Sequence, residues 1–164
     1  HVAYFSGASG DLMPYSQISG ESVNVDYVAQ GQMMAQQAWL AMDSMTKMEP
    51  GKIQTTQSKQ AAKVNESSVN ITLYAFSIGD VAFVTAPYEM FDTNGMFVKE
   101  NSPYDMTFVL SNANGASSYI AAEWAYYDDV VSYEVGKGNY AKGTGEQLAS
   151  AMVDMLNEIY PNRK

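Results

Sequence analysis

The pattern of apolar and polar positions predicts a strand, a loop and a long helix in the first third of the chain. The apolar run Val2–Phe5 is typical of a short buried strand, and the glycine- and serine-rich stretch Ser6–Gly20 is typical of a loop. A helix that reaches about Met45 follows, with Ser22 or Asn24 as its N-cap. Its apolar stripe recurs at heptad spacing and consists of Val28, Ala35, Ala38, Met42 and Met45.

The middle third predicts a β-hairpin followed by a second helix. Lys52–Ser67 is polar and is expected to be irregular or an exposed hairpin segment, whereas Ser68–Ile78 alternates as a strand does. The pair Gly79-Asp80 separates it from another apolar run, Val81–Thr85, and this arrangement is typical of a two-residue hairpin turn. Pro87 is favourable in the first turn of a helix. The inward face of that helix is expected to contain Phe91, Gly95 and Val98.

The last third predicts one more strand and a C-terminal helix. Met106–Leu110 is an apolar run, and turn-forming residues follow it in Ser111–Gly115. Ile120–Tyr140 is aromatic and shows no clear period. Thr144–Gln147 fits a capping box at the start of a helix. The apolar stripe of this helix consists of Leu148, Ala151, Met152, Met155 and Ile159.

Strands interleaved with amphipathic helices predict an α/β fold, a layered mixed β-sheet flanked by helices. The central hairpin requires an antiparallel pair, so the sheet is mixed rather than purely parallel. A chain of 164 residues that is 46% hydrophobic and 16% charged is expected to form a single folded domain, residues 1–164. Because an apolar strand pattern opens the chain, we expect this domain to be part of a larger α/β domain.

The amino-acid composition excludes or disfavours several classes of binding partner and functional site. The formal net charge is −9 with only 9 Lys plus Arg, which disfavours nucleic acids and anionic membrane surfaces as partners. The sequence has no cysteine, which excludes disulfides, thiolate metal sites and cysteine nucleophiles. No apolar run approaches about 18 residues, so we expect no transmembrane helix.

Three loops that follow predicted strands are the best place for a functional site. They are Gly7–Tyr15, Pro87–Glu89 and Asn112–Tyr119. Because ligands of open α/β sheets bind beyond the carboxyl ends of the strands, we expect these loops to converge on one rim. Glu89 and Tyr119 would each bring an oxygen donor to that rim.

Three blocks of sequence at these loops resemble the neutral, non-lysosomal ceramidase family. Phe5–Pro14 is similar to the family's Gly-Asp-Val-Ser-Pro block, and Gly79–Phe91 is similar to its strand–Pro-x-Glu–Phe block. Asn112–Glu123 is similar to a block that ends in a Tyr-Val-Thr-Thr-x-Glu-type run. The order and character of the blocks match from Val2 to about Ile159, so the resemblance covers most of the chain.

The resemblance implies a ceramidase-like, zinc-dependent hydrolase that cleaves a lipid amide in sphingolipid metabolism. It implies that Glu89 and Tyr119 are metal ligands and that Asp11 and Met13 contact substrate. In the family, two upstream histidines complete the zinc site, but the only histidine here is His1. We therefore expect the chain to be the C-terminal portion of a longer catalytic domain.

One departure from the family concerns catalysis. The family's serine nucleophile falls at Met13, which can neither attack nor transfer a proton, so no catalytic residue is assigned. By itself the chain is expected to be inactive, and the full-length protein is expected to be the enzyme. Its partners would be a lipid amide or another small molecule, and the missing N-terminal portion or a second copy of the chain. The resemblance implies an extracellular or periplasmic bacterial protein.

Other interpretations stay open at the level of sequence. Glu89 could be an acidic residue stabilised at a helix N-terminus, Tyr119 could be an ordinary half-buried aromatic residue, and Asp11 could form an Asx turn. The sequence also fits a non-catalytic binding or structural module on the same scaffold. A carbohydrate-binding module would use the neighbouring aromatic residues Trp124, Tyr126 and Tyr127.

Overall fold

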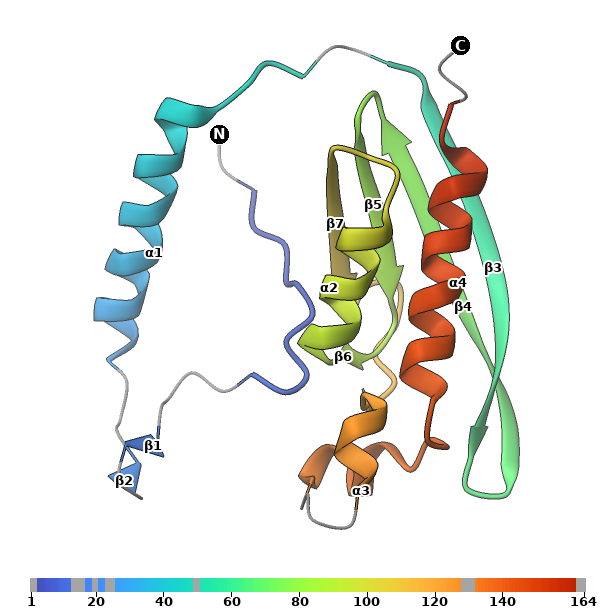
Figure 1. Ribbon diagram of the computed structural model, residues 1–164. Helices are drawn as coiled ribbons and strands as arrows, with labels where there is room; N and C mark the ends of the chain where they lie inside the picture. The colour runs from blue at the N-terminus through green and yellow to red at the C-terminus, as the bar shows by residue number, and fades with distance from the viewer. Residues whose placement is uncertain are drawn as a thin grey trace. The chain divides into compact units, whose positions relative to one another are not determined.

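The computed structural model describes residues 3–12, 17–18, 21–22, 26–48, 51–127 and 132–161 (Figure 1). The protein divides into two units. One consists of His1–Leu12 with Glu49–Lys164, and the other consists of Met13–Met48. The predicted α/β fold with a mixed sheet and flanking helices is confirmed, and it lies in the first of these units.

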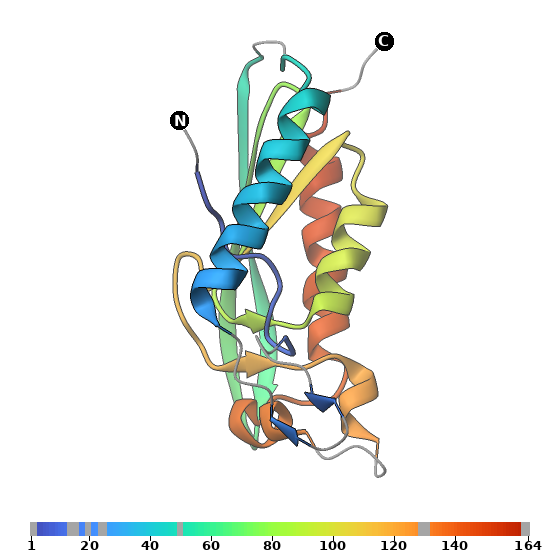
Figure 2. The ribbon, with the colours of Figure 1, turned by 90° about the vertical axis from the view of Figure 1, so that its left-hand side faces the viewer.

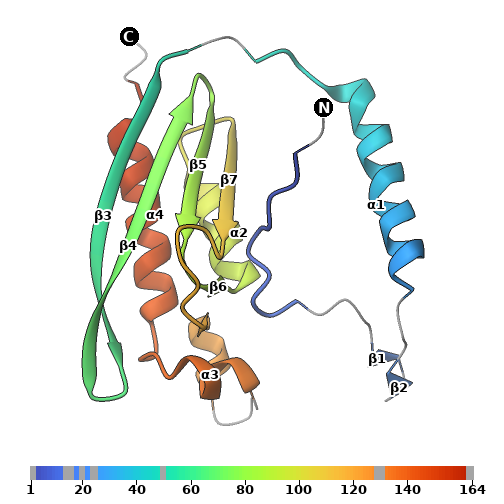
Figure 3. The same cartoon turned by 180° about the vertical axis from the view of Figure 1, so that it is seen from behind.

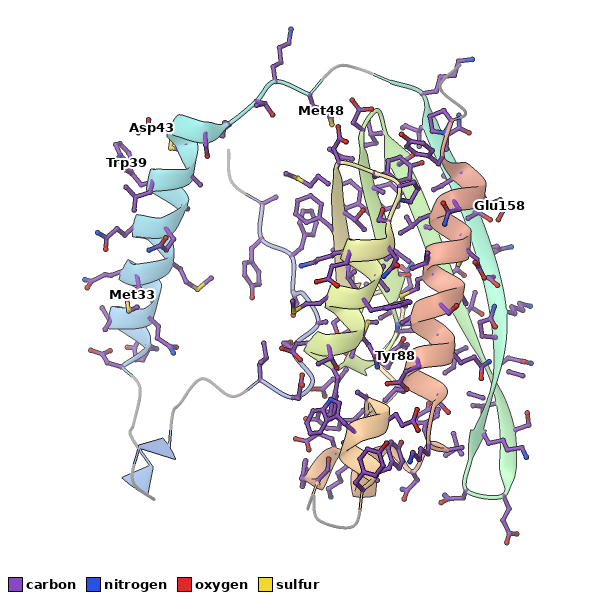
Figure 4. All side chains as sticks on the ribbon, viewed as in Figure 1. Met33, Trp39, Asp43, Met48, Tyr88 and Glu158 are labelled. Carbon is purple, nitrogen blue, oxygen red and sulfur yellow. The ribbon has the colours of Figure 1, made fainter. Side chains whose placement is uncertain are left out.

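The Met13–Met48 unit contains the predicted long helix. Helix α1 spans Tyr27–Ala41, and its N-cap is Asp26, whose carboxylate accepts the backbone N–H of Val28 at 2.9 Å. The predicted cap at Ser22 or Asn24 is therefore wrong: Ser22 belongs to a short strand, and Asn24 lies outside the described residues. No residue of α1 is buried, and apolar side chains such as Met33 and Trp39 project from it (Figure 4). The remaining elements of this unit are β1 (Gln17–Ile18), β2 (Glu21–Ser22) and the 3-10 helix η1 (Met42–Ser44).

A four-stranded sheet in the order β3-β4-β5-β7 forms the centre of the other unit. The three strands β3, β4 and β5 are joined as antiparallel neighbours, and β7 runs parallel to β5. The predicted hairpin is confirmed, with Gly79 at φ 57° in the turn between β4 and β5. The strands of this sheet are β3 (Ile53–Val64), β4 (Ser67–Ile78), β5 (Val81–Ala86) and β7 (Met106–Ser111).

Two helices cover one face of this sheet (Figure 2). Helix α2 (Asp92–Asn101) contacts β7, and helix α4 (Thr144–Ile159) lies along β3 and β4. Near the end of α4, Glu158 accepts a hydrogen bond from the hydroxyl of Thr56 on β3 at 3.0 Å (Figure 4). The apolar faces predicted for these two helices are confirmed, except that Ala151 is only half-buried, whereas the stripe predicted from Val28 to Met45 contains no buried residue. Their buried members are Phe91, Gly95 and Val98 in and before α2, and Leu148, Met152, Met155 and Ile159 in α4.

The opposite face of the sheet carries a row of aromatic rings (Figure 3 shows the sheet from this side). Phe83 stacks on Phe76 with ring centroids 4.6 Å apart and on Phe108 at 5.0 Å. The ring of Phe5 lies over the row, 6.0 Å from that of Phe83. The predicted buried strand at Val2–Phe5 is wrong for its described residues, since Tyr4 is 76% and Phe5 48% exposed. The Phe5 ring covers the aromatic row instead of entering the core.

The polar segment 52–67, predicted to be irregular or an exposed hairpin segment, belongs to a hairpin, because it contains the twelve-residue strand β3, which pairs antiparallel with β4. Its side chains alternate between exposed and partly buried, as in a strand with one face on the core. The inward positions, however, are mostly polar residues, among them Thr56, Ser58 and Gln60, so hydrophobicity alone does not alternate. In β3 the exposure of the side chains alternates with a period of two residues, but their polarity does not.

One predicted helix start and one predicted helix cap are also wrong. The helix expected from Pro87 begins at Asp92, because the intervening residues extend into the short strand β6 (Glu89–Met90). In α4 the predicted capping box is absent: Gly143 is the N-cap, and the Thr144 hydroxyl donates to the Ala141 carbonyl at 2.6 Å. Outside the main sheet, the unit also contains β8 (Tyr119–Ile120), the 3-10 helix η2 (Glu123–Tyr126) and α3 (Tyr133–Gly138).

Candidate functional site

The three loops predicted to converge do meet, as far as the structure describes them. Backbone hydrogen bonds join them into one rim below the main sheet. They run from Gly10 N to Met90 O (2.7 Å), from Asn112 N to Tyr88 O (3.2 Å) and from Ser117 N to Pro87 O (2.8 Å). These bonds tie Gly7–Leu12 and Asn112–Ser118 to the segment that carries Glu89.

Glu89 and Tyr119 are paired at this rim. Strands β6 and β8 are parallel neighbours with Glu89 in register with Tyr119, and Figure 2 shows the two short arrows pointing the same way. The backbone N–H of Glu89 donates to the Ser118 carbonyl at 2.9 Å. Burial raises the pKa of Tyr119, and so do its hydrogen bond to the Glu89 carboxylate and the charge of that carboxylate. Two oxygen donors far apart in the sequence are thus brought side by side.

Replacing Glu89 by glutamine is expected to lower the pKa of Tyr119 toward its ordinary value of 10.0. The substitution removes the negative charge that disfavours a phenolate next to it, while it keeps a hydrogen-bond acceptor. Carbon-13 NMR of tyrosines labelled at Cζ, assigned with Tyr119→Phe, measures the titration. Glu123→Gln is the matched control, because Glu123 lies in η2 and forms an ion pair with Lys142. An unchanged Tyr119 titration in Glu89→Gln would show that the two side chains do not interact.

Two glycines allow the backbone of this strand pair to be closely packed. A Cβ at Gly10 would lie 2.8 Å from the carbonyl oxygen of Glu89. A Cβ at Gly138, the last residue of α3, would overlap the carbonyl oxygen of Tyr119. Gly10 therefore packs against the backbone of β6, and Gly138 packs against the backbone of β8.

Asp11 holds the N-terminus of α2. Its carboxylate accepts the backbone N–H of Asp92, the first helical residue, at 2.8 Å. Partial burial raises the pKa of Asp11, although this backbone bond acts in the opposite direction. The nearby Asp92 carboxyl group also raises it. The loop is thereby fixed to the helix, and contact of Asp11 with substrate stays a prediction.

Asp11→Ala is expected to lower the free energy of unfolding by about 0.5–2 kcal/mol, because an orphan N–H of α2 loses its acceptor. Asp11→Asn keeps an acceptor and removes the charge next to Asp92, so it should cost less at neutral pH. Because the native pKa of Asp11 is raised above 3.8, the wild type gains stability relative to Asp11→Asn as the pH falls through that native pKa. Urea denaturation at neutral and acidic pH measures both effects, and equal losses in the two variants at neutral pH would contradict the capping role.

The described residues do not form a complete metal site. Within them, no group of three or more His, Asp or Glu side chains is placed to hold a metal ion. Glu89 and Tyr119 fit two positions of a zinc site by their chemistry, since a carboxylate is an established zinc ligand and a phenolate is another anionic oxygen donor. Met13 and His1, the other residues of the sequence hypothesis, lie outside the described residues.

Helix α3 brings residues to Tyr119 that the sequence did not single out. The Tyr133 ring lies 6.1 Å from the Tyr119 ring in an edge-on arrangement, and the charge of Glu134 also raises the Tyr119 pKa. Lys137 Nζ lies 5.3 Å above the centre of the Tyr133 ring. The start of α3 could have been recognised from its N-cap, Ser132, whose side chain accepts the backbone N–H of Val135 at 3.3 Å. The aromatic residues around Ser132 obscured the helical period in the sequence.

The neighbouring aromatic residues proposed for sugar binding have different environments. Tyr126 donates its hydroxyl to the Tyr140 carbonyl at 2.9 Å and is half-buried. Trp124 is 43% and Tyr127 is 53% exposed. Lys142 Nζ lies 4.2 Å from the centre of the Tyr127 ring. Of the three rings, Tyr126 is therefore half-buried, and one face of the exposed Tyr127 ring is covered by Lys142.

Two solved structures are similar to part of this chain. No family model matches the sequence, and no curated protein matches it significantly. A solved structure of a ceramidase complexed with C2 is similar, with a TM-score of 0.48 and 22% identity, over 58% of this chain and 16% of that chain. Neutral ceramidase from Pseudomonas aeruginosa is similar with a TM-score of 0.44 and 22% identity, over 53% of this chain and 15% of that chain.

Both structures are ceramidases. This is the family that the three sequence blocks resemble. The matched part of the chain makes up less than a fifth of either solved protein. None of the helices in the described part of the protein is both long and apolar enough to cross a membrane.

Proposed function

We propose that this chain supplies two zinc ligands, Glu89 and Tyr119, to a hydrolase that cleaves lipid amides. The observation that supports it best is that the two residues are in register on the parallel strands β6 and β8, where the Glu89 carboxylate is near enough to raise the pKa of Tyr119. The ordinary alternative for Glu89, stabilisation in the first turn of a helix, does not apply, because α2 starts only at Asp92. The resemblance in sequence adds the substrate class, a fatty amide.

The chemistry of the pair fits this role if further ligands come from outside the described residues. When bound, zinc polarises an amide carbonyl and acidifies a water molecule. Tyr119 must release its proton to bind as a phenolate, and its raised pKa means that this proton is held tightly while Glu89 accepts it in a hydrogen bond. Zinc binding is therefore expected to release a proton and to strengthen as the pH rises.

Amide cleavage in the natural full-length protein tests the proposal. Release of fatty acid from a short-chain ceramide is expected to stop after treatment with a chelator and to return with added zinc. The same assay with this chain alone is expected to show no turnover. Hydrolysis that survives complete removal of metal would contradict a zinc-dependent mechanism.

The setting of this enzyme follows from the same proposal. The substrate would be a lipid amide, and the additional zinc ligands would come from an N-terminal portion of the protein or from a second copy of the chain. The protein would act outside the bacterial cell or in its periplasm. Detection of the protein in the culture medium or periplasmic fraction, rather than the cytoplasm, is the expected result.

A second function, sugar binding by a non-catalytic module, is favoured by one observation. Trp124 and Tyr127 are both exposed, and both follow the end of β8 within η2 or directly after it. Aromatic faces of this kind can stack on sugar rings. Binding to a glycan panel that is lost in Trp124→Ala but kept in Glu89→Gln would favour this function over the hydrolase.

A further inference from the structure

We propose that Asn114 is a site of spontaneous deamidation, in which the backbone nitrogen of Gly115 attacks the side-chain amide. The dipeptide Asn-Gly occurs twice in the sequence, at Asn94-Gly95 and at Asn114-Gly115. Both sites have the same reacting groups, so sequence does not separate them. Their surroundings in the fold do.

The loop site leaves the reacting groups accessible. Asn114 and Gly115 are both exposed, with φ of 62° and 151°. Neither takes part in a hydrogen bond within the described residues, although the loop is anchored on each side of them by Ala113 and Ser117. They also line a cleft of about 330 Å³ beside β4, which gives water access to the amide. Glycine has no side chain to hinder its own nitrogen as a nucleophile.

The helical site blocks the same reaction. Asn94 is 4% exposed in α2, and its amide nitrogen packs over Gly145 where a Cβ would overlap it. The backbone N–H of Gly95 donates to the Phe91 carbonyl at 3.2 Å. Attack at Asn94 therefore requires this part of the helix to open, which happens only in a small fraction of molecules.

The reaction needs no cofactor. The Gly115 nitrogen loses its proton and forms a bond to Cγ of Asn114, and the bond from Cγ to the amide nitrogen of Asn114 breaks as ammonia leaves. Water then opens the cyclic imide at either carbonyl group. Opening at one gives aspartate, and opening at the other gives isoaspartate, in which the backbone continues through Cβ and Cγ. The net change is the uptake of water and the loss of ammonia.

The position of the loop gives this change a structural consequence. The bond from Ala113 N to the Ala86 carbonyl (3.1 Å) and the bond from Ser117 N to the Pro87 carbonyl (2.8 Å) bracket Asn114. Isoaspartate lengthens the backbone between these two anchors, just before β8. Either product also adds a negative charge to a protein whose net charge is already −9.

Peptide mapping by mass spectrometry after incubation at mildly alkaline pH tests the proposal. In the folded protein, conversion at Asn114 is expected to be at least about tenfold faster than at Asn94, because only the latter needs local opening. In urea the two rates should become similar. Isoaspartate at residue 114 is identified by enzymatic methylation of its free α-carboxyl group.

Asn94 serves as the control in the same molecule, and Asn114→Gln as the matched variant, since glutamine forms the larger cyclic imide much more slowly. Asn114→Gln should lose the fast phase and keep the slow one at Asn94. Similar rates at both sites in the folded protein would overturn the proposal. So would an unreactive Asn114 in a folded protein whose urea-unfolded form is converted.

Discussion

Gly138→Ala is expected to lower the free energy of unfolding by about 3 kcal/mol or more, the largest effect expected of any single substitution in this rim. In an ordinary helix this change would be stabilising, because alanine has the higher helix propensity. Here the new Cβ would overlap the Tyr119 carbonyl oxygen and lie 3.0 Å from its carbonyl carbon. Backbone atoms cannot rotate away, so α3 or β8 must move.

Gly136→Ala is the matched control for this prediction. Gly136 lies in the same helix, is exposed, and has no atom within 4 Å of the position that a Cβ would take. Its replacement is expected to raise the free energy of unfolding by about 0.5–1 kcal/mol. Chemical denaturation measures both variants. Equal stabilisation by the two substitutions would show that α3 does not pack against β8 as described.

Gly10→Ala is expected to cost about 1–3 kcal/mol of unfolding free energy. The added Cβ would lie 2.8 Å from the oxygen and 2.9 Å from the carbon of the Glu89 carbonyl group. Relief requires the loop to separate from β6, which would also weaken the hydrogen bond from Gly10 N to the Met90 carbonyl.

Gly7→Ala provides the control in the same loop, since nothing lies within 4 Å of its Cβ position. It should change stability by less than about 0.5 kcal/mol. Gly10→Ala should also shift the NMR signal of Tyr119, because displacement of β6 moves Glu89. A Gly10→Ala variant as stable as Gly7→Ala would contradict the close packing of the loop on β6.

The sequence predicted those parts of the fold in which hydrophobic period and burial coincide. Helix α4 shows this best, because Leu148, Met152 and Met155 mark its inward face and are all buried. The hairpin of β4 and β5 is recognisable because Gly79 stands between two apolar runs. In these elements apolar residues occupy the buried positions, so the hydrophobic pattern is sufficient to predict the element.

The sequence left strand β3 open between an irregular and a hairpin segment and did not predict helix α3, and both have a physical reason. The inward face of β3 is polar at Ser58 and Gln60, whose side chains are partly buried and hydrogen-bonded to each other at 2.7 Å. In α3 only Gly138 is buried, so a helix of six residues has no apolar stripe. Both β3 and α3 are stabilised by contacts with neighbouring segments. The sequences of the two elements themselves therefore say little about the structure that they form.

In the candidate site, too, the sequence predicted some features and only the structure shows others. Resemblance to a family, not periodicity, singled out Glu89 and Tyr119, and the structure adds that they are in register on parallel strands. Short strands such as β6 and β8 have two residues each and leave no periodic signal. Their pairing depends on the loop bonds and glycine contacts around them, which arise only in the folded protein.

The most direct test is a calorimetric zinc titration of the natural full-length protein and of its Glu89→Ala, Tyr119→Phe double variant. A Glu123→Ala, Tyr127→Phe variant is the matched control, with the same residue types changed at exposed positions. The wild type and the control are expected to bind zinc stoichiometrically and to release a proton, whereas the double variant should not bind at the same concentrations. Stoichiometric binding by the double variant would contradict the assignment of Glu89 and Tyr119 as zinc ligands.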